Sequence, residues 1–216
     1  MGRYRPPTLM SMSAREGEAR TTGEPAVTAV APRIEIRPIR AGDKQALKDG
    51  YERLSDSSRY RRFLSPHLSL TPAELRYFTE VDHHDHEALV AIDRASGHGI
   101  GVARYVRSRT DPDLAELAVA VSDDWQGQGV GTRLCEALAE RARSEGIKSF
   151  TALMLADNDL MLNLVSELGV VHDVRSQQGT VELMVDLPDQ NIGNVSRLLR
   201  AMARGEMDAV APGAPR

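Results

Sequence analysis

The residues best placed to do chemistry are three alternating glycines, Gly127, Gly129 and Gly131, in the run A-E-L-A-V-A-V-S-D-D-W-Q-G-Q-G-V-G at 115–131. An apolar strand pattern precedes them and a helical pattern follows. Because glycine has no Cβ, backbone amides in such a turn can closely approach a bulky anion. The helix that follows adds free N–H groups and the positive end of its dipole. The segment therefore predicts a binding site for a pyrophosphate group.

Two other phosphate-binding motifs fit this segment poorly. A P-loop ends in Gly-Lys-Ser or Gly-Lys-Thr, whereas Gly131 is followed by Thr132 and Arg133. A dinucleotide-binding fingerprint has the spacing G-x-G-x-x-G directly after an early strand. This chain has G-x-G-x-G, deep in the sequence and after strands that we expect to be antiparallel. Both alternatives are therefore disfavoured.

The first part of the chain predicts a strand, three short helices and three further strands, two of which form an antiparallel pair. Residues 33–39 alternate apolar and polar side chains, which is typical of a strand. Asp43 is the expected N-cap of the first helix, and Thr71 opens a capping box with Glu74 at the start of the third. A glycine turn at 97–99 joins two strands. The other expected elements are a helix at 55–64 and strands at 88–92, 100–106 and 114–121.

The second half predicts helices that alternate with strands, so the whole chain is expected to form a mixed α+β sandwich. In the long helix expected at 129–145, Leu134, Leu138 and Ala142 recur every fourth position and form an apolar face, and Gly146 ends the helix. The other expected elements are a strand at 148–155, a helix at 158–168, a closing hairpin at 170–174 and 180–187, and a helix at 192–202.

Residues 126–131, Gln-Gly-Gln-Gly-Val-Gly, match the Q/R-x-x-G-x-G/A signature of the GNAT superfamily of N-acyltransferases. The acidic-aromatic turn at 123–125 and the segment from Asn158 to Gly169 also resemble that family. The resemblance covers residues 33–187. It implies the GNAT fold, of class α+β, with a mixed central sheet of about six to seven strands flanked by helices. It also implies acetyl-CoA as co-substrate and no metal.

A closer resemblance lies upstream, in S-S-R-Y-R-R-F-L at 57–64, T-P-A-E-L-R-Y-F-T-E-V-D at 71–82, E-A-L-V-A at 87–91 and G-V-A-R-Y at 101–105. These segments resemble the acyltransferase domain of bacterial protein lysine acetyltransferases of the Pat type. The resemblance implies transfer of an acetyl group from acetyl-CoA to a lysine amine of a protein. Acyl-CoA synthetases are among the substrates that it suggests.

The resemblance gives each residue of the expected site a role. Glu116 takes the place of the general base, which is needed because a lysine ammonium, with a pKa of about 10.4, cannot attack. Val119, Ala120 and Val121 are expected to face the pantetheine with their backbones, and an amide among them to stabilise the oxyanion. The other expected cofactor-binding residues are Gln126, Gly127, Gln128, Gly129, Val130, Gly131, Thr132 and Asn158.

One position departs from the family pattern. The family often uses a tyrosine as general acid, seven residues after the helix-opening asparagine, and Val165 stands there. A valine cannot donate a proton, but a thiol pKa of about 8.5 makes thiolate a tolerable leaving group, with water as the acid. From the residues alone, Glu116 could also be an ordinary strand charge, and Asn158 could simply cap its helix.

Three functions remain open at this stage. The first is acetylation of protein lysines. The second is acetylation of a small amine such as a polyamine, an aminoglycoside or an amino acid, and the third is a non-catalytic acyl-CoA sensor that regulates a partner. Glu116 favours the two enzymes, whereas Val165 slightly favours the sensor. The expected partner is a protein with an accessible lysine or a small amine, and the oligomeric state is left open.

Composition limits the other partners. The 216-residue chain has a formal net charge of -4 and a pI of about 5.9, which argues against nucleic-acid binding. No run approaches the roughly 18–20 apolar residues that span a bilayer, so no membrane partner is expected. Residues 1–20 lack the apolar core of a secretory signal. The single cysteine, Cys135, excludes an intrachain disulfide, and we expect a cytoplasmic protein in which this side chain is buried.

These patterns divide the chain into three segments. Residues 1–32 predict a disordered N-terminal tail, because they are rich in Arg, Glu, Thr, Gly and Pro and show no period. Residues 33–187 are the expected acyltransferase domain. Residues 188–216 are expected to form a C-terminal helix and a flexible tail.

Some conspicuous residues are expected to have no catalytic role. The run Asp-His-His-Asp-His-Glu at 82–87 contains metal-binding types, but we expect no metal there, and His83 and His84 could instead line the acceptor cleft. The arginines at 59, 61 and 62 are expected on a solvated helix face. Trp125 is expected to be a packing residue.

Overall fold

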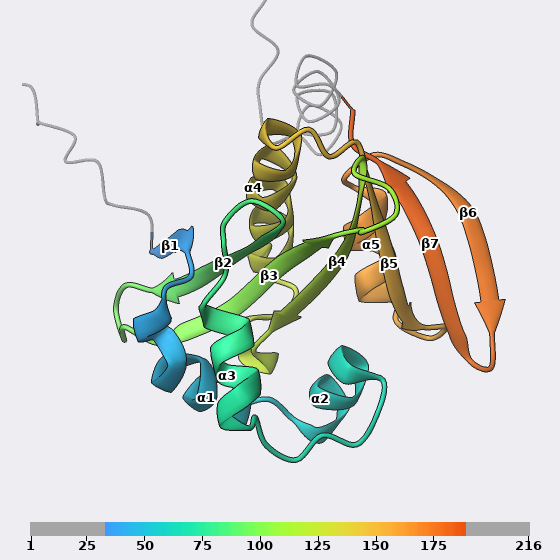
Figure 1. Cartoon of the computed structure of the whole chain (residues 1–216). Coiled ribbons are helices and arrows are strands. Elements are labelled where there is room, and N and C mark those ends of the chain that lie inside the picture. The colour runs from blue at the N-terminus through green and yellow to red at the C-terminus, as the bar shows by residue number, and fades with distance from the viewer. Residues whose placement is uncertain (1–32, 189–216) are drawn as a thin grey trace, which may run out of the picture. The chain divides into compact units, whose positions relative to one another are not determined.

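The computed structural model describes residues 33–188, which build one seven-stranded sheet with helices on both faces (Figure 1). The strand order across the sheet is β1-β2-β3-β4-β5-β7-β6. The strands are β1 (Ile34–Pro38), β2 (His86–Asp93), β3 (Gly99–Arg107), β4 (Leu114–Val121), β5 (Ser149–Leu155), β6 (Val170–Gln177) and β7 (Thr180–Asp186). The helices are α1 (Lys44–Glu52), α2 (Asp56–Phe63), α3 (Pro72–Thr79), α4 (Val130–Ser144) and α5 (Asp159–Ser166), with short 3₁₀ turns η1 (Ala41–Asp43) and η2 (Asp123–Trp125).

Neighbouring strands are antiparallel except β4 and β5, which are parallel. This mixed sheet confirms the expected α+β class. The elements expected between residues 33 and 188 are present, with ends shifted by a few residues, whereas the helix expected at 192–202 lies outside the described residues. Among the described helices, none combines the length and apolar character that a membrane crossing requires.

The main core lies between α4 and one face of the sheet. Leu134, Leu138 and Ala142 of α4 are fully buried, which confirms the predicted apolar face of this helix. Burying such side chains is the main force that holds the helix on the sheet. Cys135 is also fully buried, and burial raises the pKa of its thiol to about 12. The expected burial of this cysteine is therefore confirmed.

Helices α1, α2 and α3 cover the opposite face of the sheet (Figure 1). Two of them begin at side-chain caps. The Ser55 hydroxyl accepts a hydrogen bond from the Ser58 amide, and Thr71 forms the predicted capping box with Glu74.

Asp43 is the N-cap residue of α1, as predicted, but its side chain does not cap the helix. Its carboxylate accepts instead from both terminal nitrogens of Arg37, each at 2.8 Å, and from the Arg40 amide. The bidentate pair with Arg37 takes both carboxylate oxygens and lowers the pKa of the Asp43 carboxyl.

The two parallel strands part soon after they meet. Leu114–Glu116 of β4 pairs with Ser149–Thr151 of β5, and no pairing follows. Strand β3 continues to pair with β4 up to Val121, and β7 pairs with β5 along its whole length. Each parting strand is thus held on its outer side, while α2 contacts both strands at the opening (Figure 1).

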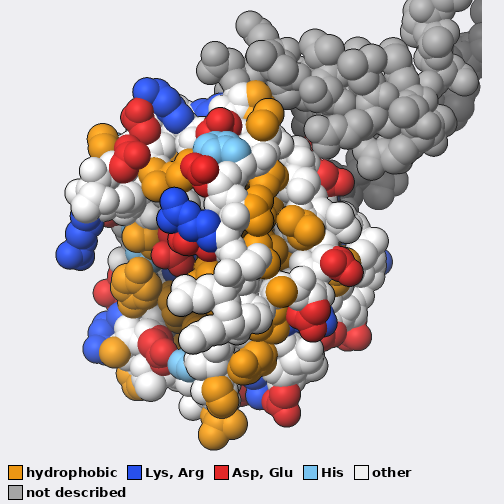
Figure 2. Space-filling model, turned by 90° about the vertical axis from the view of Figure 1, so that its right-hand side faces the viewer, with side chains coloured by type: hydrophobic (Ala, Val, Ile, Leu, Met, Phe, Trp, Pro, Cys, Tyr) orange, Lys and Arg blue, Asp and Glu red, His pale blue; other side chains and the backbone are white. Residues whose placement is uncertain are grey.

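The sheet ends at β6, whose edge is poorly suited to pairing with another chain. The register shifts between His172 and Arg175, and Asp173 there adopts a left-handed backbone with φ of 50°. Val170 and Val174 are exposed, and Figure 2 shows hydrophobic side chains mixed with charged ones on this side of the molecule. A bulge and edge charges both discourage strand addition.

We predict that Gly169→Ala destabilises the fold. An added Cβ would lie 1.7 Å from the backbone oxygen of Asp186, so the start of β6 or the end of β7 must move. Such overpacking typically costs about 1–3 kcal/mol of unfolding free energy. The matched control is Gly42→Ala, since Gly42 is exposed and its added Cβ meets nothing within 4 Å. Urea unfolding of both variants measures the difference, and equal midpoints would contradict the prediction.

Candidate functional site

A cleft of about 590 Å³ opens where β4 and β5 part. Its walls come from α2, the β4 strand, the loop before α4, the end of β5 and α5. The expected site residues that line it are Glu116, Val119, Ala120, Val121, Gln126, Gly127, Gly129, Gly131, Thr132 and Asn158. Gln128 and Val130 do not line it: Gln128 is exposed beside the loop, and the Val130 side chain is buried in the core.

The loop before α4 presents free backbone donors. Gly127 and Gly129 have φ of 70° and 75°, a backbone conformation that favours glycine. Within the described part of the chain, no hydrogen bond uses the backbone N–H groups of residues 127–132. Gly129 caps α4 without a side-chain bond, so the first turn of this 15-residue helix also keeps its dipole end open. Free backbone donors beside a helix N-terminus are the kind of group that binds a pyrophosphate.

The two glutamines of the motif shape the loop with their side chains. Gln126 Nε2 donates to the Val121 carbonyl at 3.0 Å and to the Ser58 hydroxyl at 3.2 Å. Gln128 Nε2 donates to the Asp124 carbonyl at 2.6 Å. These side-chain amides are therefore engaged by the protein itself, and the contribution of the loop to an anion comes from backbone amides.

Asp123 ties α2 to the same loop. Its carboxylate accepts from the Ser55 amide and hydroxyl at 2.9 Å and from the Ser58 hydroxyl at 2.7 Å. Burial alone would raise the pKa of Asp123, but these hydrogen bonds outweigh it and lower that pKa. The carboxylate thus stays charged and fixes α2, one wall of the cleft, against the loop.

The unpaired edge of β4 turns backbone amides toward the gap. The Ser122 amide donates to Ile100 of β3, whereas the Val121 carbonyl accepts from Gln126 on the other side. Because hydrogen-bonding direction alternates along a strand, Val119 also points its amide toward the gap and Ala120 points its own toward β3. The expectation that all three backbones face the cleft is therefore corrected: Ala120 lines it with other atoms.

Glu116 is the last β4 residue paired with β5, opposite Thr151. Its side chain is exposed and lines the cleft. Side chains alternate across a strand, so Glu116 shares the α2 face with Ala120, whereas Leu117 packs into the α4 core. A carboxylate is thus held at the mouth of the gap, beside the unpaired edge of β4.

The two positions that the sequence singled out at α5, Asn158 and Val165, lie in different surroundings. Asn158 lines the cleft and also caps the helix, because its Oδ1 accepts from the Met161 amide at 3.2 Å. Its side-chain NH₂ remains available to donate into the cleft. Val165 is fully buried in the core, so the position of the family tyrosine does not face the cleft in this chain.

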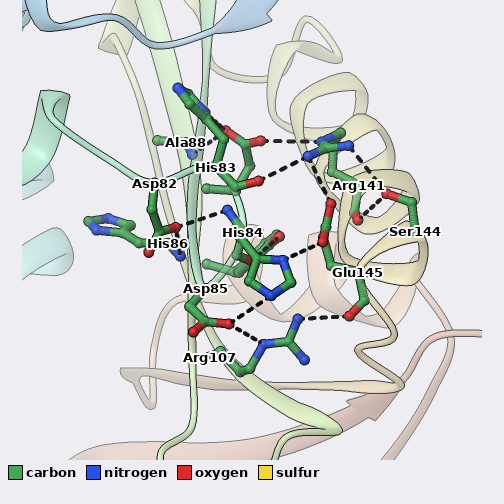
Figure 3. Close-up of polar contacts among 12 residues, drawn as sticks. Asp82, His83, His84, Asp85, His86, Ala88, Arg107, Arg141, Ser144 and Glu145 are labelled. Carbon is green, nitrogen blue, oxygen red and sulfur yellow. Dashed lines mark hydrogen bonds and ion pairs between the residues drawn. The ribbon is translucent and has the colours of Figure 1, made fainter.

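The histidine-rich run before β2 joins that strand to the end of α4 (Figure 3). Glu87, 1% exposed, lies 2.7 Å from His83 Nδ1 and accepts from Arg141 Nε at 3.2 Å. His84 Nδ1 lies 2.5 Å from a Glu145 oxygen. Neither histidine lines the cleft, so that expectation is wrong. Between residues 33 and 188, no group of three or more His, Cys, Asp or Glu could hold a metal.

Sequence reasoning missed part of the wall that α2 contributes. The three arginines of α2 are partly buried, not on a solvated face. Arg59 bonds to backbone carbonyls of α1, while Arg61 and Arg62 line the cleft. The R-Y-R-R sequence at 59–62 could have indicated this wall. Its charge favoured a solvent-exposed helix face instead, because arginine is mostly exposed in proteins. Trp125 lies partly buried under the Arg33 guanidinium, in agreement with a packing role, and also lines the cleft.

Comparisons with known proteins agree with this architecture. A family model described as the acetyltransferase (GNAT) domain matches residues 33–171. The chain is similar to Acetyltransferase Pat of Mycolicibacterium smegmatis, with 39% identity over 153 residues that cover 71% of this chain and 45% of that protein. The chain therefore spans less than half the length of this relative.

Solved structures show the same fold. The GNAT domain of S. lividans PAT matches with a TM-score of 0.65 and 33% identity, over 71% of this chain and 90% of that one. A putative acetyltransferase from Salmonella typhimurium, solved with its cofactor acetyl-CoA, matches in fold with a TM-score of 0.61 and 20% identity, over 74% of this chain and 96% of that one. The chain therefore belongs to the GNAT family of acetyltransferases.

Proposed function

We propose that this chain transfers the acetyl group of acetyl-CoA to the side-chain amine of a lysine on another protein, such as an acyl-CoA synthetase. The observation that carries the proposal is the position of Glu116, an exposed carboxylate at the mouth of the gap between β4 and β5. A side chain presented by a partner protein can reach an exposed carboxylate. The resemblance of residues 57–64 and 71–82 to Pat-type enzymes supports the same acceptor.

In the proposed reaction, Glu116 removes a proton from the lysine ammonium, directly or through a water. The neutral amine attacks the thioester carbonyl, so a C–N bond forms as the C–S bond to CoA breaks. The Val119 amide, turned into the gap, is the proposed donor to the oxyanion. Val165 is buried and has no acidic proton, so water protonates the departing thiolate and receives in turn the second proton that the attacking nitrogen loses as the amide forms. A thiol pKa of about 8.5 makes thiolate a good leaving group.

The backbone amides of residues 127–132 hold the pyrophosphate of acetyl-CoA in this proposal, together with the N-terminal turn of α4. The side-chain NH₂ of Asn158 adds a donor on the opposite wall of the cleft. We also propose that the protein acts in a reducing cytoplasm, which suits a single buried thiol.

We predict that Gly129→Ala weakens acetyl-CoA binding. Gly129 has φ of 75°, and an alanine there strains the backbone by about 1–2 kcal/mol and shifts the amides that face the pyrophosphate. The expected result is a Kd for acetyl-CoA raised about tenfold, measured by calorimetry. The matched control is Gly179→Ala in the β6–β7 turn, which has φ of 82°, equally open surroundings and no place in the cleft. An equal loss in both variants would mean that the loop does not bind the cofactor.

We predict that Glu116→Gln loses turnover but keeps acetyl-CoA binding. The amide preserves the shape of the side chain but cannot accept the ammonium proton. General-base catalysis typically contributes about 10²–10⁴-fold, so kcat should fall by that range while the Kd stays unchanged. Glu140→Gln, on the exposed side of α4, is the control and should retain full activity. Full activity in Glu116→Gln would remove this residue from the mechanism.

The assay is release of free thiol from acetyl-CoA, with purified acyl-CoA synthetases in one arm and a panel of small amines in the other. The fully buried Cys135 thiol, with its raised pKa, should not react with the thiol reagent in the native protein. Release with the synthetases supports the proposal. Thiol release only with small amines would indicate that the acceptor is a small molecule. No thiol release in either arm, despite tight acetyl-CoA binding, would favour a non-catalytic sensor.

A further inference from the structure

A second cavity, of about 260 Å³, lies between the sheet and helices α1 to α3. It shares a wall with the acetyl-transfer cleft, and this wall is formed by Leu54, Arg62, Phe63 and Ala120. Much of the rest of its lining is apolar, including Ile39, Leu47, Leu70, Phe78, Val90 and Val102. A cavity of this kind suits a small, largely apolar molecule.

Arg104 of β3 reaches the cavity and is only 5% exposed. Its guanidinium lies 4.4 Å from the centre of the Phe78 ring and donates to the Phe78 carbonyl. Its Nη1 lies 3.0 Å from His86 Nε2, and His86 is neutral because burial and the nearby guanidinium lower its pKa to about 4. Burial, followed by the charge of Arg62, lowers the pKa of Arg104 to about 9, so Arg104 is charged at neutral pH. Within residues 33–188 its hydrogen-bond partners are His86 and the Phe78 carbonyl, and neither is a carboxylate.

Arg62 of α2 lines the same cavity. In the described residues, no hydrogen bond or ion pair uses its guanidinium, whose ring contact is with Phe63 at 5.0 Å. Burial lowers the pKa of Arg62, and the charge of Glu116 acts in the opposite direction. The planar fork of N–H donors therefore remains available to a ligand.

The cavity also contains an ion pair, but this pair does not offset the charges of Arg62 and Arg104. Arg37 and Asp43 neutralise one another through two 2.8 Å hydrogen bonds. Arg62 and Arg104 thus bring two positive charges to largely apolar surroundings. The charge of Glu116 acts on Arg62, whereas no carboxylate is among the groups that shift the pKa of Arg104, and a buried charge of this kind favours an anion as partner. We propose that the cavity binds a small aliphatic carboxylic acid, whose carboxylate contacts Arg62 and Arg104 and whose chain occupies the apolar part.

The ligand class follows from the two kinds of lining. A carboxylate matches the guanidinium fork in geometry and restores the missing negative charge. The apolar residues favour an alkyl chain over a strongly hydrated inorganic anion. Such a carboxylate can belong to a free acid or to an amino acid whose amine approaches the neighbouring cleft. The inference is independent of the proposed lysine acceptor, since binding is measured without acetyl-CoA.

The test is calorimetric titration of the full chain with hexanoate, with norleucine and with the neutral analogue hexanamide. At least one of the two carboxylates should bind, with hexanamide at least about tenfold weaker, the loss expected when a charge-assisted contact is removed. Arg62→Gln and Arg104→Gln should each weaken carboxylate binding about tenfold or more. Arg61→Gln is the matched control, because Arg61 neighbours Arg62 on α2 but lines the cleft only.

The outcomes separate the sources of the carboxylate. Binding of hexanoate identifies a free-acid site, whereas binding of norleucine alone, with thiol release from acetyl-CoA, identifies an amino-acid acceptor. Binding of neither carboxylate, equal binding of hexanamide, or undiminished binding in Arg62→Gln would overturn the proposal. Circular dichroism checks that each variant is folded, and Arg62→Gln decides the matter if the more deeply buried Arg104 cannot be replaced.

Discussion

The structure depends on the hydrogen bonds that β4 and β5 do not make with each other. Beyond Glu116 and Thr151, the facing edges of the two strands do not pair with each other. Buried backbone N–H and C=O groups normally have a hydrogen-bond partner. Strands β3 and β7 hold β4 and β5 apart from outside. The gap can therefore persist, and its exposed backbone groups become available to a ligand. A fully paired sheet would present no Val119 amide and no cleft.

The gap is kept in shape by a polar network that joins three elements. Asp123 receives hydrogen bonds from Ser55 and Ser58 of the α2 region, and Gln126 donates to Ser58 and to the end of β4. These bonds fix the loop before α4 and the α2 wall together. Precise placement of donors is what electrostatic stabilisation of a transition state requires. Arg62 enters the cleft on that same helix, so the network also positions the wall between the two cavities.

The motif around Gly129 predicted the loop of free backbone amides because local glycine chemistry determines its conformation. The helices and strands within residues 33–188 followed from hydrophobic periodicity for the same local reason. The parting of β4 and β5 was not predictable, since both segments have ordinary strand patterns and their pairing is a long-range property. The hydrogen bonds of Gln126, the partial burial of Arg62 and the burial of Arg104 likewise depend on tertiary contacts. The general rule that polar residues are exposed does not predict them.

The most direct test of the central claim is a crystal structure of the chain with a conjugate of CoA and a lysine peptide. The account predicts that the pyrophosphate lies on the amides of residues 127–132 and that the linking carbonyl oxygen lies about 3 Å from the Val119 nitrogen. The lysine nitrogen should lie beside Glu116, directly or through one water. A conjugate bound outside the gap, or a lysine that enters away from Glu116, would contradict the account.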